Sequence, residues 1–380
     1  MGISFWPNPD SDVRQHAMLY AFRRVVPWGV VFVLSACGGG GGSPPAAPPP
    51  PNPLYVRTSG KDTNSGADPA NALRTISKAA SIVRSNYKVI VGPGTYREGV
   101  TTPGPGVAPQ GLQFLADTSG AQTTDAPGPV VLDGAGTGDG AGFNLFNSGG
   151  TVIDGFTITN FTDAGIVIKS GSDNLTMQNC IIFSNPGDGV RVQDSANVLV
   201  FNNLVYGNAG TGVALVGPTS GSPNGHVINN TIFANQFRGL TVGTSTRAST
   251  GAFVRNNIIQ NSGTDFSIKV FAPPPVSVPR SDVGYDADFN LVFPATYQPS
   301  NVEGRHDVAR DAQFVNAAVG NFHLRSSSPA INVGDSLTTM QELQNFLRDR
   351  TTTGGNDCDK SALDLGYHYL PDTRCTAVGP

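Results

Sequence analysis

The chain has 380 residues and a formal net charge of −4, with 14% charged residues and 47 glycines. Little charge with abundant glycine is typical of turn-rich β-structure, and the length suits one elongated body or at most two domains. The acidic balance offers no broad basic surface, which argues against nucleic acid as a partner.

The first 37 residues have the features of an export signal. Arg23 and Arg24 precede an apolar run at 25–34 that is too short to span a bilayer. The run ends in Leu-Ser-Ala-Cys at Cys37, which resembles the cleavage box of bacterial lipoproteins and implies cleavage before Cys37 and lipid attachment to it. The alternative is a plain secretion signal or an anchor. Met18 is a second candidate for the translation start.

Residues 38–53 are predicted to form a tether between the signal and the folded domain. Five consecutive glycines make its first part flexible, and a proline-rich run makes the rest stiff. No aspartate follows Cys37, so the lipoprotein resemblance implies an outer-membrane lipoprotein of the cell envelope, facing the periplasm or the surface. Its contact with the membrane is then the lipid anchor at Cys37.

Residues 54–380 are predicted to form one folded domain, which begins with a strand and an amphipathic helix. The apolar residues of this helix fall on one face and suit a cover over the open end of a stack of repeats. They are Leu73, Ile76, Ala79, Ala80 and Val83.

Pairs of apolar residues five positions apart recur through the middle of the chain, with steps of 24, 23, 27 and 27 residues between their first members. A glycine stands twelve residues after each first member except in the last repeat, where Phe266 takes its place. Periods of this length are typical of solenoids, in which each repeat buries its apolar face against its neighbour. The pairs are Ile153–Ile158, Met177–Ile182, Val200–Val205, Val227–Ile232 and Val254–Ile259, and the glycines are Gly165, Gly189, Gly212 and Gly239.

After each glycine, β-branched and other apolar residues alternate with period two, as in Ile166 and Ile168 around Val167. This pattern predicts half-buried strands and excludes leucine-rich and helical repeats. The expected fold class is therefore all-β, a single-stranded right-handed parallel β-helix with an N-terminal capping helix. One asparagine per repeat is expected to stack its side-chain amide and to tolerate a left-handed backbone at one corner. These residues are Asn160, Asn185, Asn208, Asn235 and Asn261.

The cysteines suggest one disulfide and one inert thiol. Cys358 and Cys375 lie seventeen residues apart in a loop-rich tail, and disulfides persist outside the cytoplasm, so we expect these two residues to pair. Cys180 occupies a repeat position that asparagine holds in later repeats, which predicts a buried thiol. No close pairs of cysteine or histidine are present, so zinc is not expected.

Short motifs mark the two ends of the domain. They are YVR and SGKD within 55–62, NALRTI at 71–76 and VGPGTYRE at 91–98, and then DAQFV at 311–315, FHL at 322–324, SPAIN at 328–332 and DLGY at 364–367. These ends resemble the pectate-lyase-like β-helix superfamily, which implies a capping helix before the first coil and a closing segment over 311–380. The resemblance covers nearly the whole mature chain, but lyases, epimerases, hydrolases and non-catalytic members share these ends, so it does not specify an activity.

Charged residues stand just before the post-glycine strands or at their outward positions. Asp188, Arg238 and Asp265 each lie eleven residues after the start of a repeat, so they are predicted to line up along the axis at about 4.8 Å per coil. A row of mixed charge suits a polyanion. The members are the cations Lys169, Arg191, Arg238 and Lys269 and the acids Asp163, Asp188 and Asp265.

The family resemblance implies that this flank binds uronic-acid polymers and that a lysine or arginine acts as base. Abstracting the proton beside a uronate carboxylate needs a base and a stabiliser of the enolate that forms. The alternative is a solvated row of charges, because the dense aspartate clusters of calcium-dependent lyases and the motifs of polygalacturonases are missing. The candidates are Lys169 or Arg191 as catalytic base, Asp163 and Asp188 as ligands of Ca²⁺, and Arg238, Lys269 and Asp265 as substrate-binding residues.

Three further features of the sequence could bear on function. Residues 133–142 alternate glycine with aspartate and suit either Ca²⁺ or a plain loop. Residues 272–310 are long for a connection and are expected to lie beside the binding flank. His226, His306 and His323 are scattered, so surface or packing positions are expected for them.

Two classes of function remain open from the sequence. The first is an envelope lipoprotein enzyme, a polysaccharide lyase or epimerase, with Ca²⁺ as a possible cofactor. The second is a non-catalytic protein that binds carbohydrate, mediates adhesion or has a structural role in the envelope. The expected partners are an acidic polysaccharide and, through the lipid, a membrane, and the protein is expected to be a monomer.

Overall fold

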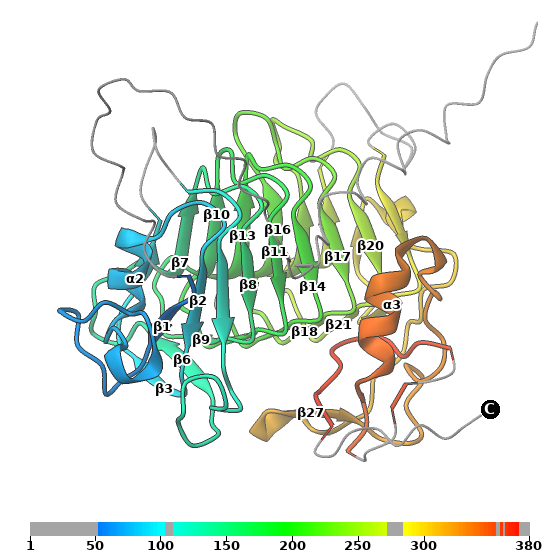
Figure 1. Cartoon of the computed structure of the whole chain (residues 1–380). Helices are drawn as coiled ribbons and strands as arrows, with labels where there is room; N and C mark the ends of the chain where they lie inside the picture. The colour runs from blue at the N-terminus through cyan, green and yellow to red at the C-terminus, as the bar shows by residue number, and fades with distance from the viewer. Residues whose placement is uncertain (1–51, 103–108, 272–283, 355–357, 360–361, 372–380) are drawn as a thin grey trace, which may run out of the picture.

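The computed structural model describes residues 52–102, 109–271, 284–354, 358–359 and 362–371. Its strands form three parallel sheets of nine, eight and eight strands, and each strand pairs with its counterparts in the preceding and following coils. Figure 1 shows the three sheets running along one elongated solenoid. The predicted parallel β-helix is therefore confirmed.

The three sheets are named A, B and C in the order in which each coil enters them. Sheet A contains β1 (Leu54–Val56), β2 (Lys88–Val91), β5 (Gln113–Ala116), β8 (Val152–Asp154), β11 (Thr176–Gln178), β14 (Leu199–Phe201), β17 (His226–Ile228), β20 (Phe253–Arg255) and β23 (Asp286–Asp288). Sheet B contains β3 (Gly94–Tyr96), β6 (Val130–Asp133), β9 (Thr157–Thr159), β12 (Ile181–Phe183), β15 (Leu204–Tyr206), β18 (Thr231–Phe233), β21 (Ile258–Gln260) and β24 (Leu291–Phe293). Sheet C contains β4 (Val100–Thr101), β7 (Ala141–Phe146), β10 (Ala164–Lys169), β13 (Asp188–Gln193), β16 (Thr211–Val216), β19 (Arg238–Val242), β22 (Phe266–Val270) and β25 (Tyr297–Gln298).

The elements outside the three sheets are short. They are the helices α2 (Ile76–Ile82) and α3 (Gln341–Arg348), the 3₁₀ turns η1 (Pro69–Asn71), η2 (Ser300–Val302), η3 (Ala317–Val319) and η4 (Thr338–Met340), and the antiparallel hairpin of β26 (Phe314–Asn316) and β27 (Asn321–Leu324).

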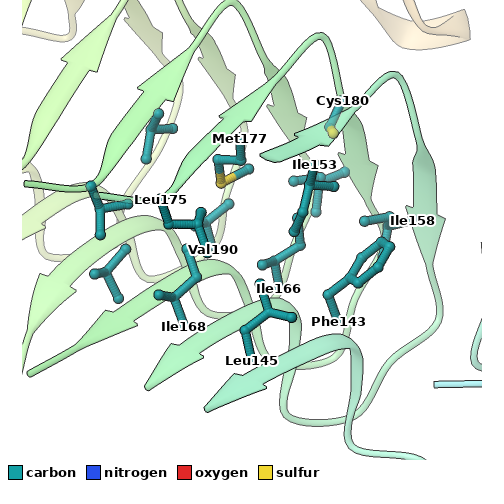
Figure 2. Close-up of a cluster of buried hydrophobic side chains, with 14 of the residues drawn as sticks. Phe143, Leu145, Ile153, Ile158, Ile166, Ile168, Leu175, Met177, Cys180 and Val190 are labelled. Atoms are coloured by element: carbon teal, nitrogen blue, oxygen red, sulfur yellow. The ribbon is translucent and has the colours of Figure 1, made fainter. Parts of the chain in front are cut away.

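The five-residue frame predicted from the sequence is a pair of buried rows, one in sheet A and one in sheet B. Met177 pairs in register with Ile153, and Ile182 pairs with Ile158. The frame residues of the next three coils continue the same registers. All of them are fully buried, and Figure 2 shows several of these side chains pointing into the shared interior. Each buried aliphatic side chain stabilises the stack by about 1.5–3 kcal/mol.

Sheet C supplies the third wall of the core through the alternating residues that follow each glycine. Ile166 lies in register with Val190, and the row continues through Val213 and Leu240, all of them fully buried. The glycine of each coil is required by close packing. A Cβ atom on Gly212 would lie 2.5 Å from the Cγ2 atom of Ile232 in the next coil, and the other glycines of this row have a similar clash.

The asparagine corner is built differently from the prediction, because amide stacking and the left-handed backbone occur at two adjacent positions and not at one. Asn185, Asn208 and Asn235 form a buried ladder. In it, the backbone N–H and the side-chain amide of one asparagine both donate to the Oδ1 atom of the asparagine in the following coil. The left-handed backbone lies one residue earlier in each coil. Asn160 and Asn261 occupy that earlier position, with φ of 65° and 51°, so these two residues do not belong to the ladder.

A second buried ladder lies at the corner between sheets A and B. It contains Asn203, Asn230, Asn257 and Asn290, with Cys180 at its start. The backbone N–H of Cys180 donates to the Oδ1 atom of Asn203 at 3.0 Å, and burial raises the pKa of the thiol to about 12. Cys180 is therefore buried, as predicted from its place in the repeat.

The solenoid extends beyond the repeats that the sequence revealed. Residues 284–298 belong to a further coil, in which Ala287 and Val292 continue the two buried rows and Asn290 continues the ladder. These residues are therefore a coil and not the connection predicted over 272–310, with β23 in sheet A, β24 in sheet B and β25 beside β22 in sheet C. Residues 272–283 lie outside the described residues.

Helix α2 lies near the first strands, as Figure 1 shows, and packs against β1, β2 and β4. Its N-terminus is capped by Thr75, which accepts from the N–H of Lys78, and by the Glu98 carboxylate, which accepts from the N–H groups of Ile76 and Ser77. The predicted apolar face, Leu73, Ile76, Ala79, Ala80 and Val83, is buried in the main core.

The segment after residue 310 covers the outer sides of sheets A and B. Helix α3 contributes Leu343 and Leu347 to an apolar cluster with outward residues of sheet A, among them Phe201. The β26–β27 hairpin places Phe314 and Phe322 against outward aromatic residues of sheet B. These covers explain why outward positions of both sheets carry large apolar side chains.

Several sequence predictions fall on residues that the structure does not describe. These are the signal with Met18 and Cys37, the tether up to residue 51, and Cys375. Cys358 is disulfide-bonded, and its pairing with Cys375 stays a prediction.

Candidate functional site

The outer side of sheet C, called the C face below, differs from the outer sides of sheets A and B. One outward row, in register from β4 to β22, is largely polar, and its neighbouring row contains Lys169 and Gln193. On the outer side of sheet C, the only buried apolar cluster among the described residues is the small group of Ala141, Ala164 and Val167. Polar and charged side chains, most of them half-buried, make the C face the best candidate for ligand binding. The first row consists of Thr101, Asn144, Val167, Arg191, Ala214, Thr241 and Lys269.

The structure brings three of the predicted site residues together at one edge of the C face. The Nε atom of Arg191 lies 2.8 Å from Asp188 Oδ2, and its Nη2 atom lies 2.8 Å from Asp163 Oδ1. Burial lowers the pKa of Arg191, but the hydrogen bonds and charges of both aspartates outweigh it and raise the pKa overall. Arg191 therefore stays protonated and is unsuited to act as a base.

Lys169 lies in a neighbouring cavity of about 230 Å³. No described residue forms an ion pair with its ammonium group. Asp139 and Asp163 also line the cavity, and the Oδ1 atom of Asn144 is buried without a hydrogen-bond partner among the described residues. The segment 133–142, which the sequence left open as a loop or a calcium site, forms one wall of this cavity through its last residues.

A second group of charges lies at the same edge, further along the axis. Arg238 donates to the Asp265 carboxylate through Nε at 2.9 Å, and Lys269 Nζ lies 3.5 Å from the same carboxylate. The guanidinium of Arg238 stacks over the ring of Phe237, and the ammonium of Lys269 lies near Phe271. The aromatic residues of this group were missed in the sequence, where only the charged residues were considered.

The predicted common register of Asp188, Arg238 and Asp265 is wrong in one member. Arg238 is in register with Asp188 through Thr211, but its partner in the next strand is Phe266. The last repeat has one extra residue before the strand, so Ser267 takes the glycine position that the sequence assigned to Phe266. Asp265 therefore precedes its strand as Asp163 and Phe237 do, and it still reaches Arg238 from there.

The arrangement around Asp163 and Asp188 does not suit a calcium ion. Calcium takes six to eight oxygen ligands, whereas both carboxylates bind Arg191, a cation that a metal ion would have to displace. In the described part of the chain, no three His, Cys, Asp or Glu residues are grouped closely enough to hold a metal. These two carboxylates are therefore partners of Arg191 and not calcium ligands.

The three histidines singled out in the sequence lie away from the C face, in line with their predicted packing and surface roles. His226 is on sheet A beside Phe253, and burial lowers its pKa to about 4. His306 stacks on Phe289 and binds Asp288, and His323 stacks on Tyr369.

The lowered pKa of His226 predicts a loss of stability in acid. Between pH 6.5 and 4 the unfolded chain binds a proton that the folded protein excludes, so stability falls as the pH drops through this window. We expect His226→Gln to reduce the loss between pH 7 and 4.5 by roughly 2 kcal/mol, measured by urea unfolding at both values. His306→Gln is the control that removes an imidazole from an exposed site without relieving any burial, and the acid loss should persist in it. Equal slopes in His226→Gln and the unmodified protein would contradict the assignment.

Comparison with known proteins agrees with the fold. Residues 133–232 match the family model for the right-handed β-helix region. Among curated proteins, none is similar enough in sequence to count as a relative. None of the helices in the described part of the chain has the length and hydropathy that crossing a bilayer requires.

Three solved structures illustrate the similarity. Pectate lyase Pel9A shares 15% sequence identity at a TM-score of 0.42, with 76% of this chain and 92% of that chain covered. A rhamnogalacturonan lyase shares 13% at 0.35, covering 73% and 93%, and a pectin methylesterase crystallised with a hexasaccharide shares 11% at 0.36, covering 64% and 78%. These scores lie below 0.5 and carry no argument about activity. The strand registers and the family match together identify the chain as a protein with a right-handed parallel β-helix region.

Proposed function

We propose that the C face binds an acidic polysaccharide that runs along the solenoid axis. The observation that carries the proposal is the placement of two charged groups, around Arg191 and Arg238, at one edge of the same face. Successive coils repeat at about 4.8 Å along the axis, so the two groups lie along the direction that a linear polymer would follow. The ammonium group of Lys169, which no described residue pairs, adds an available positive charge.

Lys169 is also the best candidate for a catalytic base. In β-elimination, the base takes the proton from the carbon beside the uronate carboxylate, the electron pair forms a carbon–carbon double bond, and the bond to the glycosidic oxygen breaks as that oxygen takes up a proton. In epimerisation, water donates a proton to the opposite face of the same carbon. Arg191 is unsuited to the base role because its pKa is raised, and its retained charge would instead oppose the negative charge of the enolate.

Non-catalytic binding by the same face is the second candidate. Asp139 and Asp163 line the cavity beside Lys169 and would repel a uronate carboxylate placed there. This arrangement favours a binding or adhesive module in which the polymer contacts the edge of the face without entering the cavity.

The location of the protein is proposed from the sequence alone. A lipid on Cys37 would hold the domain at the outer membrane, and the glycine- and proline-rich tether would separate it from the bilayer. Replacing Cys37 with serine should release the protein from the membrane fraction, which cell fractionation would detect. Unchanged fractionation would contradict the lipid anchor.

Binding and turnover should be measured on one panel of pectate, alginate and glycosaminoglycans, with added calcium and with a chelator. For an enzyme, we expect an ultraviolet-absorbing unsaturated uronate, or a changed uronate epimer ratio by NMR. Lys169→Ala should then lower turnover at least about 100-fold while affinity changes less than threefold. Lys88→Ala, which removes a lysine from β2 of sheet A and leaves the C face intact, is the matched control and should keep turnover.

The outcomes separate the two candidates. Binding without product under any calcium condition leaves the non-catalytic module and removes the enzyme. Retained turnover in Lys169→Ala removes Lys169 as the base. If no acidic polymer binds, the proposed function is wrong.

A further inference from the structure

The group around Arg238 is more than a charged pair, because three phenylalanine rings surround the cations. We call it the aromatic patch. It consists of Phe237, Arg238, Asp265, Phe266, Lys269 and Phe271.

The two cations hold the patch together from within. The guanidinium of Arg238 lies 4.1 Å from the ring centroid of Phe237 and 5.6 Å from that of Phe271, and it binds Asp265. Lys269 lies 4.9 Å from the Phe271 centroid and reaches the same carboxylate. Arg238 therefore fixes both the ring of Phe237 and the carboxylate of Asp265.

The surface of the patch is a ring and a carboxylate rather than the cations. Phe237 is 44% exposed, and the side chain of Asp265 is 31% exposed. The side chains of Arg238 and Lys269 are only 11% and 17% exposed. An exposed aromatic ring beside an oriented acceptor suits a ligand with an apolar face and hydroxyl donors. A sugar ring has both.

Along the edge of the C face, the residues that immediately precede the strands between the patch and the Arg191 group are glycines. Phe237 immediately precedes β19, and the equivalent residues before β16 and β13 are Gly210 and Gly187. A Cβ atom on Gly187 would lie 1.9 Å from the carbonyl oxygen of Asp163, and one on Gly210 would lie 2.3 Å from Asp188 Oδ1. A chain that follows this edge therefore passes over backbone between the two charged groups.

We propose that Phe237 and Asp265 form a binding position for one sugar ring, with Phe237 against its C–H face and Asp265 accepting from its hydroxyl groups. This inference rests on the proposed function and specifies which part of the polymer the protein recognises. Recognition of hydroxyls and of an apolar ring face needs no carboxylate on that sugar. The substrate class is therefore an acidic glycan. The sugar bound at this position is recognised through its pyranose ring and hydroxyl groups and not through a carboxylate.

The distance between Lys169 and the sugar position at Phe237 sets a minimum length for a ligand that contacts both. Three coil steps lie between the strand of Lys169 and that of Phe237, which corresponds to about 14 Å along the axis. Lys169 ends its strand whereas Phe237 precedes its own, so the two residues also lie apart across the sheet. An oligosaccharide of more than about four residues is therefore needed to contact both, and shorter ones should bind more weakly.

The test uses calorimetry on the whole mature protein with the acidic polymer that binds best in the panel and with its oligomers of two to six residues. Phe237→Ala should weaken binding of the hexamer about tenfold and of the dimer less than twofold. Phe237→Tyr keeps the ring and should restore affinity to within about twofold. Phe293→Ala is the matched control, because Phe293 is 36% exposed on sheet B, away from the C face.

Reducing the uronates of the oligomers to neutral sugars separates the roles of ring and charge. The loss of affinity caused by Phe237→Ala should persist on the reduced hexamer. If the patch instead recognised carboxylates, Phe237→Ala would no longer change the affinity for the reduced hexamer. Hexamer affinity unchanged in Phe237→Ala overturns this inference alone, provided that the unmodified protein binds the polymer. Failure of the unmodified protein to bind any acidic polymer overturns the proposed function as well. Thermal unfolding of each variant shows that the fold is retained.

Discussion

Replacing Gly212 with alanine should destabilise the protein by about 3 kcal/mol or more. A Cβ atom at this position would lie 2.5 Å from Ile232 Cγ2 and 2.8 Å from both Asn235 Nδ2 and the Gly239 carbonyl oxygen. All three neighbours belong to the next coil and are fixed by core packing or by the ladder, so none can move away at low cost. The clash therefore separates two coils of the solenoid. Urea unfolding monitored by circular dichroism would measure the loss.

Gly354→Ala is the matched control, because a Cβ atom there meets nothing within 4 Å and its backbone is not left-handed. It should change stability by less than about 0.5 kcal/mol. If Gly212→Ala is equally mild, the coils are less closely packed at this corner than the structure shows.

Removing one amide from the middle of the first ladder should have a similarly large effect. In Asn208→Ala, the N–H and the side-chain amide of Asn185 lose their acceptor, and Asn235 Oδ1 and the Ile182 carbonyl lose a donor. Each buried polar group left without a partner costs about 1–3 kcal/mol, so a total loss of about 3–4 kcal/mol is expected.

Asn197→Gly tests whether burial causes this effect. Asn197 belongs to an exposed chain of amides with Asn174 and Asn224, and glycine accepts its φ of 56°. The free energy of unfolding of the Asn197→Gly variant should differ from that of the unmodified protein by less than about 1 kcal/mol in the same urea titration. Equal losses in the two variants would mean that the buried ladder contributes no more than a surface one.

Both features bear on function because they set the spacing of the C face. The glycine row and the ladder lie at the turn between sheets B and C, next to Asp163, Asp188 and Phe237. A partial loosening of this corner would change the distances between the charged groups. Variants that retain the fold but weaken the ladder should therefore also bind polymer less tightly.

The sequence predicted the central coils well because a single physical requirement repeats in them. Every inward position must be apolar, so Ile153 to Ile259 show their period directly. The coil of Ala287 and Val292 escaped notice because its step is 33 residues and alanine replaces the larger side chain. Asp265 was misaligned for a related reason, since one extra residue before β22 shifts every position that is counted from the start of the repeat.

The amino-acid sequence by itself determined the parallel β-helix, the inward rows and the outward direction of Lys169 and Arg191, because a period of two assigns each strand residue to one side of its sheet. Only the tertiary structure decided what those outward residues do. The pairing of Arg191 with Asp163 joins different coils, the aromatic patch gathers residues from two coils, and the covers over sheets A and B come from the segment after residue 310. Such contacts depend on how coils of unequal length stack on one another, and no local pattern encodes that register.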